Sequence, residues 1–121
     1  MTIFESLLLA HIVGDWLLQT EWQANNKIHK WQALLSHVIV YHLVILAVLI
    51  AWFGFRNTTV YITVAVLAVT HAVLDLRRPV EWIMKMLRHS VTNQSERWLV
   101  IVIDQSIHII LIGLASLFLS R

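Results

Sequence analysis

The chain has 121 residues, of which 59% are hydrophobic and 13% are charged, and its net charge is +2. Soluble domains are near half apolar and a quarter charged, so this composition favours one integral membrane domain over residues 1–121. The small net charge gives no reason to expect nucleic-acid binding, and the absence of cysteine excludes disulfides, thiolate metal ligands and cysteine nucleophiles.

Four segments are long and apolar enough to be predicted as membrane spans, namely 3–20, 31–53, 60–76 and 98–119. A spanning helix needs about 20 residues, with about 17 as the lower limit, so the first and third segments are at the short end. Similar lengths and short connections predict an all-α membrane protein built as an antiparallel bundle of four transmembrane helices.

The linker between the third and fourth spans carries a helical pattern of its own. Its apolar residues recur at helical spacing: Val80, Ile83, Met84, Leu87 and Val91. Pro79 suits the first turn of a helix. The pattern predicts an amphipathic helix lying in the membrane interface, and a soluble surface helix packed on the bundle is the open alternative.

The basic residues predict the orientation of the chain. Most of them lie in the linkers after the first and third spans: Lys27, Lys30, Arg77, Arg78, Lys85, Arg88 and Arg97. Only Arg56 and Arg121 fall on the other side. By the positive-inside rule, the two basic linkers face the cytoplasm and both termini face out.

Every aspartate has a histidine four residues away, in or beside a predicted span. The pairs are His11 with Asp15, His71 with Asp75, and Asp104 with His108. Residues four apart share one face of a helix, and ionisable groups at membrane depth cost about 2.5–3.5 kcal/mol each on insertion scales. In the predicted topology all three pairs, together with His37, fall in the cytoplasmic half, so we expect one functional site there.

A metal ion is the first candidate for what these side chains bind. Imidazole and carboxylate ligands without thiolate suit zinc first, with manganese or iron as alternatives. The candidate ligands exceed the need of one ion: His11, Asp15, His37, His71, Asp75, Asp104 and His108. Either some aspartates orient ligand histidines or two ions lie about 3.5–4 Å apart, and we favour two ions.

Simpler interpretations stay open for the individual residues. Any single pair could be a hydrogen bond between helices, because polar groups also join helices in membranes. His37 has no acidic partner at this spacing and could be a packing histidine. His42 lies about 140° round the helix from His37 and is therefore left outside the predicted site.

Four polar side chains are expected to contact the substrate. Gln19 continues the face of His11 and Asp15, and Gln105 follows Asp104. Lys27 and Arg78 lie at the cytoplasmic rim, where they could hold a lipid phosphate. Topology-setting charge is the alternative for the two cations, and hydrogen bonding between helices is the alternative for the two amides.

The run HIVGDWLLQTEW (11–22) resembles the signature H-x-x-G-D-x-x-L-Q-x-x-W of a small bacterial inner-membrane family of unknown function. The runs HAVLD (71–75) and DQSIH (104–108), with Lys27 and His37, fit the same pattern, so the resemblance covers nearly the whole chain. The family pattern continues as D-W-x-K after the third-span aspartate, whereas Arg78 stands here at the lysine position, which keeps the charge but not its geometry. The family is similar in style to inner-membrane metal-dependent hydrolases, which is an analogy.

Together these features predict an intramembrane metal-dependent hydrolase that acts on a lipid or lipid-linked phosphate from the cytoplasmic leaflet. The catalytic residues would be Asp15, Asp75 and Asp104, one of them doubling as general base. The alternatives are a metal-ion or proton transporter that uses the same cluster, and a non-catalytic membrane subunit with a structural metal. A homodimer that shares a site across its interface is also open.

Overall fold

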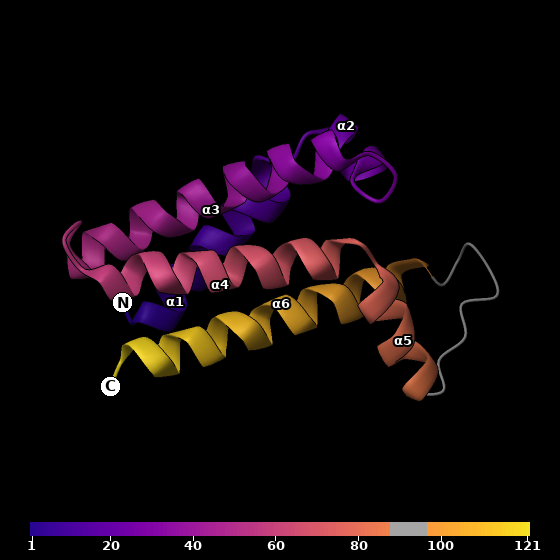
Figure 1. The fold of residues 1–121 in the computed structure, drawn as a ribbon. Helices are drawn as coiled ribbons and strands as arrows, with labels where there is room; N and C mark the ends of the chain where they lie inside the picture. The colour runs from indigo at the N-terminus through magenta and orange to yellow at the C-terminus, as the bar shows by residue number, and fades with distance from the viewer. Residues whose placement is uncertain (88–96) are drawn as a thin grey trace.

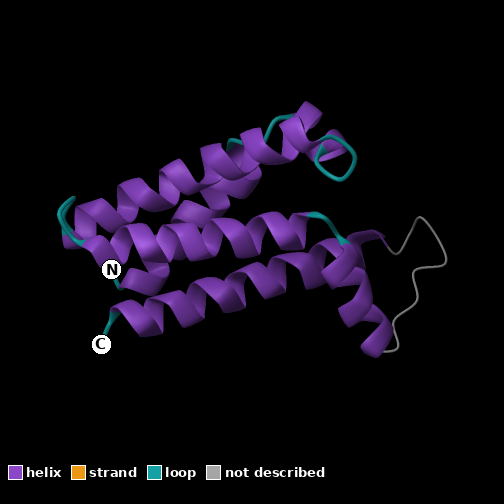
Figure 2. Ribbon diagram, in the orientation of Figure 1, coloured by secondary structure: helices purple, strands orange, loops and turns teal. Residues whose placement is uncertain are grey.

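The computed structural model describes residues 1–87 and 97–121, and its regular structure there is helical throughout (Figures 1 and 2). The elements in chain order are α1 (Ile3–Ile12), the π-helical segment η1 (Val13–Leu17), α2 (Glu21–Asn26), α3 (Trp31–Phe53), α4 (Thr58–Asp75), α5 (Arg78–Met86) and α6 (Arg97–Leu119).

Three of these helices, α3, α4 and α6, are long and apolar enough to cross a membrane. They match the second, third and fourth predicted spans closely, which confirms an all-helical protein with candidate membrane spans. The predicted first span is not confirmed. Helical structure there runs from Ile3 to Leu17, which falls short of the lower limit of about 17 residues.

The return between α3 and α4 is tight because two residues are suited to it. Gly54 ends α3 with a φ of 79°, a left-handed conformation that glycine adopts without steric cost. The Asn57 side chain then accepts a hydrogen bond at 3.0 Å from the backbone N–H of Thr59 and caps the start of α4. The two long helices therefore lie side by side, as Figure 1 shows.

The amphipathic helix expected after the third span is present as α5. Arg77 precedes it with a φ of 65°, and Pro79 lies in its first turn. Val80 and Met84 are buried, whereas Trp82 is 61% exposed. The helix packs on α4 and α6. The predicted continuation to Val91 and the basic Arg88 lie outside the described residues.

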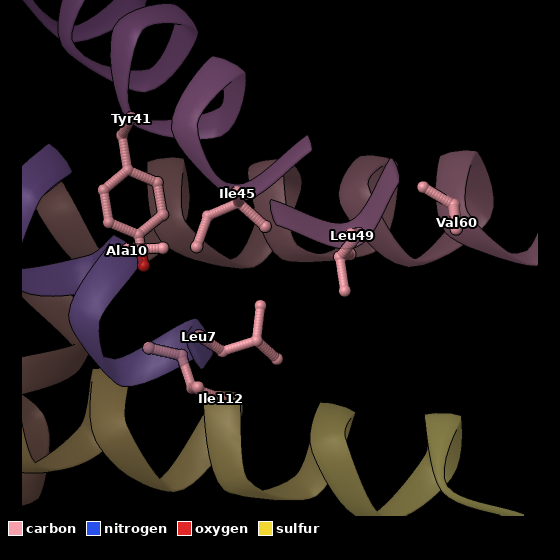
Figure 3. Close-up of a cluster of buried hydrophobic side chains, with 7 residues drawn as sticks. All are labelled: Leu7, Ala10, Tyr41, Ile45, Leu49, Val60 and Ile112. Atoms are coloured by element: carbon pink, nitrogen blue, oxygen red, sulfur yellow. The ribbon is translucent and has the colours of Figure 1, made fainter. Parts of the chain in front are cut away.

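The apolar core lies between α1, α3, α4 and α6. Its buried members are Leu7, Ala10, Tyr41, Ile45, Leu49, Val60 and Ile112 (Figure 3). The chain termini and the turn between α3 and α4 lie together at one end of the molecule (Figure 1). Most of the core belongs to that half, and the buried histidines and aspartates gather toward the other half.

Candidate metal centre

Four buried side chains from three elements converge in the polar half. Asp15 comes from η1, His37 from α3, and His71 and Asp75 come from successive turns of α4. None of the four residues is more than 5% exposed. Because charged groups without water need partners, their mutual geometry decides what they can do.

The imidazole of His37 lies at the centre of this cluster. Its Nε2 is 3.0 Å from Asp15 Oδ1 and 3.3 Å from Asp75 Oδ2. The same nitrogen is 3.1 Å from Nε2 of His71. Nε2 of His71 lies in turn 3.3 Å from Asp75 Oδ2 and 3.9 Å from Asp15 Oδ1. We call these four side chains the His/Asp cluster.

The spacing of Asp15 Oδ1, His37 Nε2 and His71 Nε2 suits a metal ion. Ligand atoms at about 2.0–2.1 Å from zinc in a tetrahedron are roughly 3.3 Å from one another. The measured separations of 3.0–3.9 Å bracket that value. Asp15 Oδ1 and Asp75 Oδ2 are also buried without a hydrogen-bond partner among the described residues. The His/Asp cluster could therefore hold a metal ion.

A π-helical turn aims Asp15 into the cluster. In η1 the N–H of Leu18 donates to the carbonyl of Val13 at 2.9 Å, five residues back instead of four. The extra residue in the turn shifts the phase of the helix, and such turns occur frequently at functional sites. As a result, Asp15 contacts His37 on α3, whereas His11 contacts other partners. The structure separates the predicted pair.

Gly14 permits the close approach of η1 to α3. A Cβ atom at this position would lie 2.8 Å from Cδ2 of Tyr41 and 3.2 Å from its Cα. Neither side-chain rotation nor a small shift of Tyr41 would relieve both contacts, because one of them is with the backbone. A residue with a side chain at position 14 would therefore push η1 away from α3.

A second set of candidate metal ligands overlaps the His/Asp cluster. His71, Asp75 and His108 place ligand atoms close enough to share an ion. Nδ1 of His108 donates to the backbone oxygen of Asp104 at 2.8 Å, and its buried Nε2 has no partner among the described residues. A histidine held in this way through one nitrogen presents the lone pair of the other, as metal-binding histidines do. The His/Asp cluster and this second set thus share His71 and Asp75.

Lys27 brings a positive charge to the edge of the His/Asp cluster. Its Nζ donates to Asp75 Oδ1 at 2.8 Å. The other oxygen of this carboxylate, Oδ2, faces His37 and His71. With its amide oxygen turned to the ammonium, Gln19 accepts from Lys27 at 3.0 Å and donates to the backbone oxygen of Asp15 at 3.2 Å. The two predicted substrate residues Gln19 and Lys27 therefore lie against the candidate ligands Asp15 and Asp75.

Gln105 connects α6 to Asp15. Its Nε2 donates to Asp15 Oδ2 at 2.7 Å, which leaves Oδ1 facing His37. Its Oε1 accepts from Nε2 of His11 at 2.8 Å and from the indole N–H of Trp16 at 2.9 Å. The other ring nitrogen of His11 accepts from the hydroxyl of Tyr41 at 2.9 Å. Both nitrogens of His11 are thus engaged, and His11 belongs to neither ligand set.

Asp104 is also outside both ligand sets. Its carboxylate is 23% exposed and lies 3.7 Å from Nδ1 of His108. It lines an open groove of about 500 Å³ at the polar end, a volume within the range of small-molecule sites. Other lining residues are Asp15, Gln19, Lys27, Arg77 and Gln105. Arg78 is exposed at the start of α5, and Arg77 is the arginine that lines the groove.

Sequence reasoning missed one contact of this site. Tyr41 follows His37 by one turn, and its ring lies 4.2 Å from that of His71 between centroids. The same spacing rule that gave the His and Asp pairs could have found it. His42, set aside from the sequence, is buried with Nδ1 donating to its own helix at Val38, and it has no place in either set.

The fold and site define an all-helical protein with three helices that could span a membrane and a buried His/Asp cluster that could hold a metal ion. The chain belongs to a family described as protein of unknown function, DUF3307, whose family model matches residues 3–120. No curated protein and no solved structure matches the chain. Membership of a family of unknown function agrees with the resemblance seen in the sequence, and the link to hydrolases stays a prediction.

Proposed function

We propose that this protein is an intramembrane metal-dependent hydrolase that acts on a lipid or lipid-linked phosphate from the cytoplasmic leaflet. The observation that carries the proposal is that buried Asp15, His37 and His71 each place one ligand atom at metal-ligand spacing, with Asp75 Oδ2 3.3 Å from Nε2 of both histidines. These candidate ligands lie beside an open groove, as a catalytic metal requires, because such a metal keeps one position for water or substrate.

The proposed membrane arrangement is an antiparallel bundle of four spans in the bacterial inner membrane, with both termini outside. In this arrangement α1 and η1 form a short first span, since α1 packs on α3 and α6. The basic groups Lys27 and Arg77 lie at the cytoplasmic end beside the groove. Exposed Trp82 on α5 suits the membrane interface, where tryptophan is enriched.

The proposed metal is zinc, with manganese or iron as alternatives, because the ligands are nitrogen and oxygen without sulfur. One ion would bind the His/Asp cluster, and a second would use His71, Asp75 and His108. A bound ion would supply a hydroxide nucleophile at neutral pH. Within reach of the groove, the partly exposed Asp104 is suited to accept a proton from water.

The phosphate of the substrate would lie near Lys27 and Arg77. Both cations line the groove together with Asp15 and Asp104. Charge-assisted hydrogen bonds from such cations to phosphate oxygens are stronger than neutral ones and hold the group in place. Gln19 and Gln105 also line the groove, where their amides would keep Lys27 and Asp15 oriented.

A conduit for protons or metal ions is the second candidate, and one feature favours it. The rings of His37, His71, His108 and His11 follow one another with centroids 5.2, 4.6 and 5.8 Å apart. A pathway across the membrane would also need polar groups in the other half, where Ile45, Leu49 and Val60 are fully buried (Figure 3). A structural metal is the third candidate, and an open groove beside the ligands speaks against a closed site.

Metal content is the first test of the proposal. Detergent-purified protein is analysed by inductively coupled plasma mass spectrometry beside His37→Ala and Asp75→Ala, with His42→Ala as a buried histidine outside both sets. We expect stoichiometric metal in the native chain and in His42→Ala, and a loss of at least tenfold in the other two. A native protein that is folded but binds no metal would remove the proposal and favour the conduit.

Turnover is the second test, made on the metal-loaded protein in vesicles that contain anionic phospholipids. We expect release of phosphate or headgroup that stops on chelation and returns with zinc. Asp104→Asn should keep its metal and lose most of the activity, because Asp104 lies outside both ligand sets. Metal binding without turnover on any phospholipid tested would favour a structural metal.

A further inference from the structure

A groove runs along the seam between α4 and α6, in the half of the molecule away from the His/Asp cluster. Its volume is about 330 Å³, and its apolar lining includes Ile62, Val66 and Leu67 from α4 and Leu111, Leu114 and Phe118 from α6. The hydroxyl of Thr70, which also lines it, donates to the carbonyls of its own helix at 3.0 Å. The groove therefore presents an almost wholly apolar surface.

The same seam continues into the metal site. Leu67, Thr70 and Leu111 line a much smaller hollow of about 10 Å³ beside His71 and His108. Farther along, a cavity of about 50 Å³ is lined by Lys27, by Asp75 at the end of α4, by Arg77 just before α5 and by Asp104 from α6, together with apolar side chains such as Leu74 and Val100. Three hollows thus follow one another in register along both helices, and their lining changes from apolar to a mixture of apolar and charged side chains.

We propose that this seam binds one acyl chain of an anionic phospholipid, with its phosphate between Lys27 and Arg77 at the His/Asp cluster. The inference rests on the proposed function and names its substrate class. A lipid of the cytoplasmic leaflet has its headgroup at the cytoplasmic end and its chains toward the bilayer centre. The order of the three hollows is the same, because the charged cavity lies at the predicted cytoplasmic end and the apolar groove lies deeper.

Dimensions and charge agree with this occupant. The stretch of α4 from Ile62 to Thr70 rises about 12 Å, enough to follow a large part of one chain into the leaflet. Val66 and Phe118, which line the groove, are 57% and 62% exposed. Exposed apolar side chains on a membrane helix meet lipid chains. Lys27 and Arg77 supply positive charge for a phosphate at that end, in a cavity that also contains Asp104 and the Lys27 partner Asp75.

The test uses phosphatidylglycerol that carries a photoactivatable diazirine in one acyl chain, in phosphatidylcholine vesicles that contain the full chain. The protein is first treated with chelator, so that neither metal nor turnover is needed for labelling. We expect peptides that contain residues 62–70 and 111–118 to carry several-fold more label than the peptide that contains Ile39 and Leu43, on the exposed face of α3. Equal labelling of all exposed faces would overturn the proposal, and this result needs no variant.

A groove-filling variant sharpens the test. Ala115 lines the groove, so Ala115→Trp should reduce labelling there several-fold. Ala47→Trp, on an exposed face of α3 away from the groove, is the matched control and should leave the labelling unchanged. Undiminished labelling of a folded Ala115→Trp protein would overturn the proposal.

A second copy of the chain is the other occupant that the groove could have. Because the chain has no cysteine, Val66→Cys carries a single thiol in the groove, and Val69→Cys carries one on an exposed face beside it. Rapid disulfide dimerisation of the Val66 variant alone would show that the groove is a dimer interface and would overturn lipid binding. Slow and equal dimerisation of both variants is expected.

The two proposals fail separately. Groove labelling without bound metal or turnover would remove the hydrolase and leave a lipid-binding protein. Metal-dependent hydrolysis with uniform labelling, and with full activity in Ala115→Trp, would remove the groove as the acyl-chain site and leave the hydrolase.

Discussion

The two halves of this molecule are held together in different ways by the same helices. In one half, α3 and α4 meet through His37, His71 and Asp75, at hydrogen-bonding distances. In the other half they meet through Ile45, Leu49 and Val60, which are fully buried (Figure 3). In lipid, apolar helix contacts contribute packing with little hydrophobic driving force, whereas a polar group that loses its partner stays buried. The polar half should therefore be the more sensitive to substitution.

The largest effect is expected for Lys27→Met. The change removes the cation at 2.8 Å from Asp75 Oδ1 and leaves a buried carboxylate oxygen without its donor. Breaking a buried ion pair from one side typically costs about 3–5 kcal/mol. The free energy of unfolding of the metal-free protein should fall by about this amount in a detergent titration. In the double variant Lys27→Met with Asp75→Asn most of the lost free energy of unfolding should be recovered. A loss that persists would contradict the view that the unpaired charge of Asp75 causes it.

A smaller effect is expected in the apolar half for Leu49→Ala. Truncation of a fully buried leucine leaves a cavity, and such changes cost about 2–5 kcal/mol in soluble proteins. We expect the lower end, about 2 kcal/mol, because the unfolded helices remain in an apolar environment. Metal content should not change. Leu43→Ala, at a position that is 59% exposed, should stay within about 0.5 kcal/mol of the native chain.

Gln105→Leu tests whether metal binding depends on how the candidate ligand Asp15 is oriented. The variant keeps Asp15 but removes the donor that holds Oδ2 at 2.7 Å. Loss of such supporting contacts typically weakens metal binding about 10–100-fold. Calorimetric titration with zinc measures this change. Ser106→Ala is the adjacent control, because the exposed Ser106 donates to a carbonyl of its own helix, and its zinc affinity should equal that of the native chain.

The smallest effect is expected for Tyr41→Phe. The substitution removes one hydrogen bond, from the hydroxyl to Nδ1 of His11 at 2.9 Å, and keeps the ring. The free energy of unfolding should fall by about 1 kcal/mol, and zinc affinity should be unchanged because His11 is outside both ligand sets. A fall in zinc affinity as large as that of Gln105→Leu would bring His11 into the metal site.

The long helices could be predicted from the sequence because their apolar runs are continuous. The predicted spans 31–53, 60–76 and 98–119 lie within two residues of α3, α4 and α6. The third-span pair His71 and Asp75 keeps helical spacing and lies in contact, as expected. The spacing rule works there because α4 is a regular helix from Thr58 to Asp75.

The centre of the site could not be predicted in the same way. His37 had no partner in its own helix, and its role depends on how α3 is rotated toward α4 and η1. The order of apolar and polar residues in a single span does not show how that helix is rotated about its axis relative to its neighbours. The separation of His11 from Asp15 has a different cause, since a π-helical turn changes the phase without changing which residues are apolar.

The π-helical turn also makes the site sensitive to chain length. A turn closed by a bond from Leu18 to Val13 contains one residue more than an α-helical turn. Deletion of a single residue there, such as Val13, would allow a regular α-helix and would leave all the candidate ligands in the chain. All that follows would then rotate by about 100°, and Asp15 would point away from His37. A one-residue gap in this segment among relatives would therefore mark chains that have kept the composition of the site and lost its geometry.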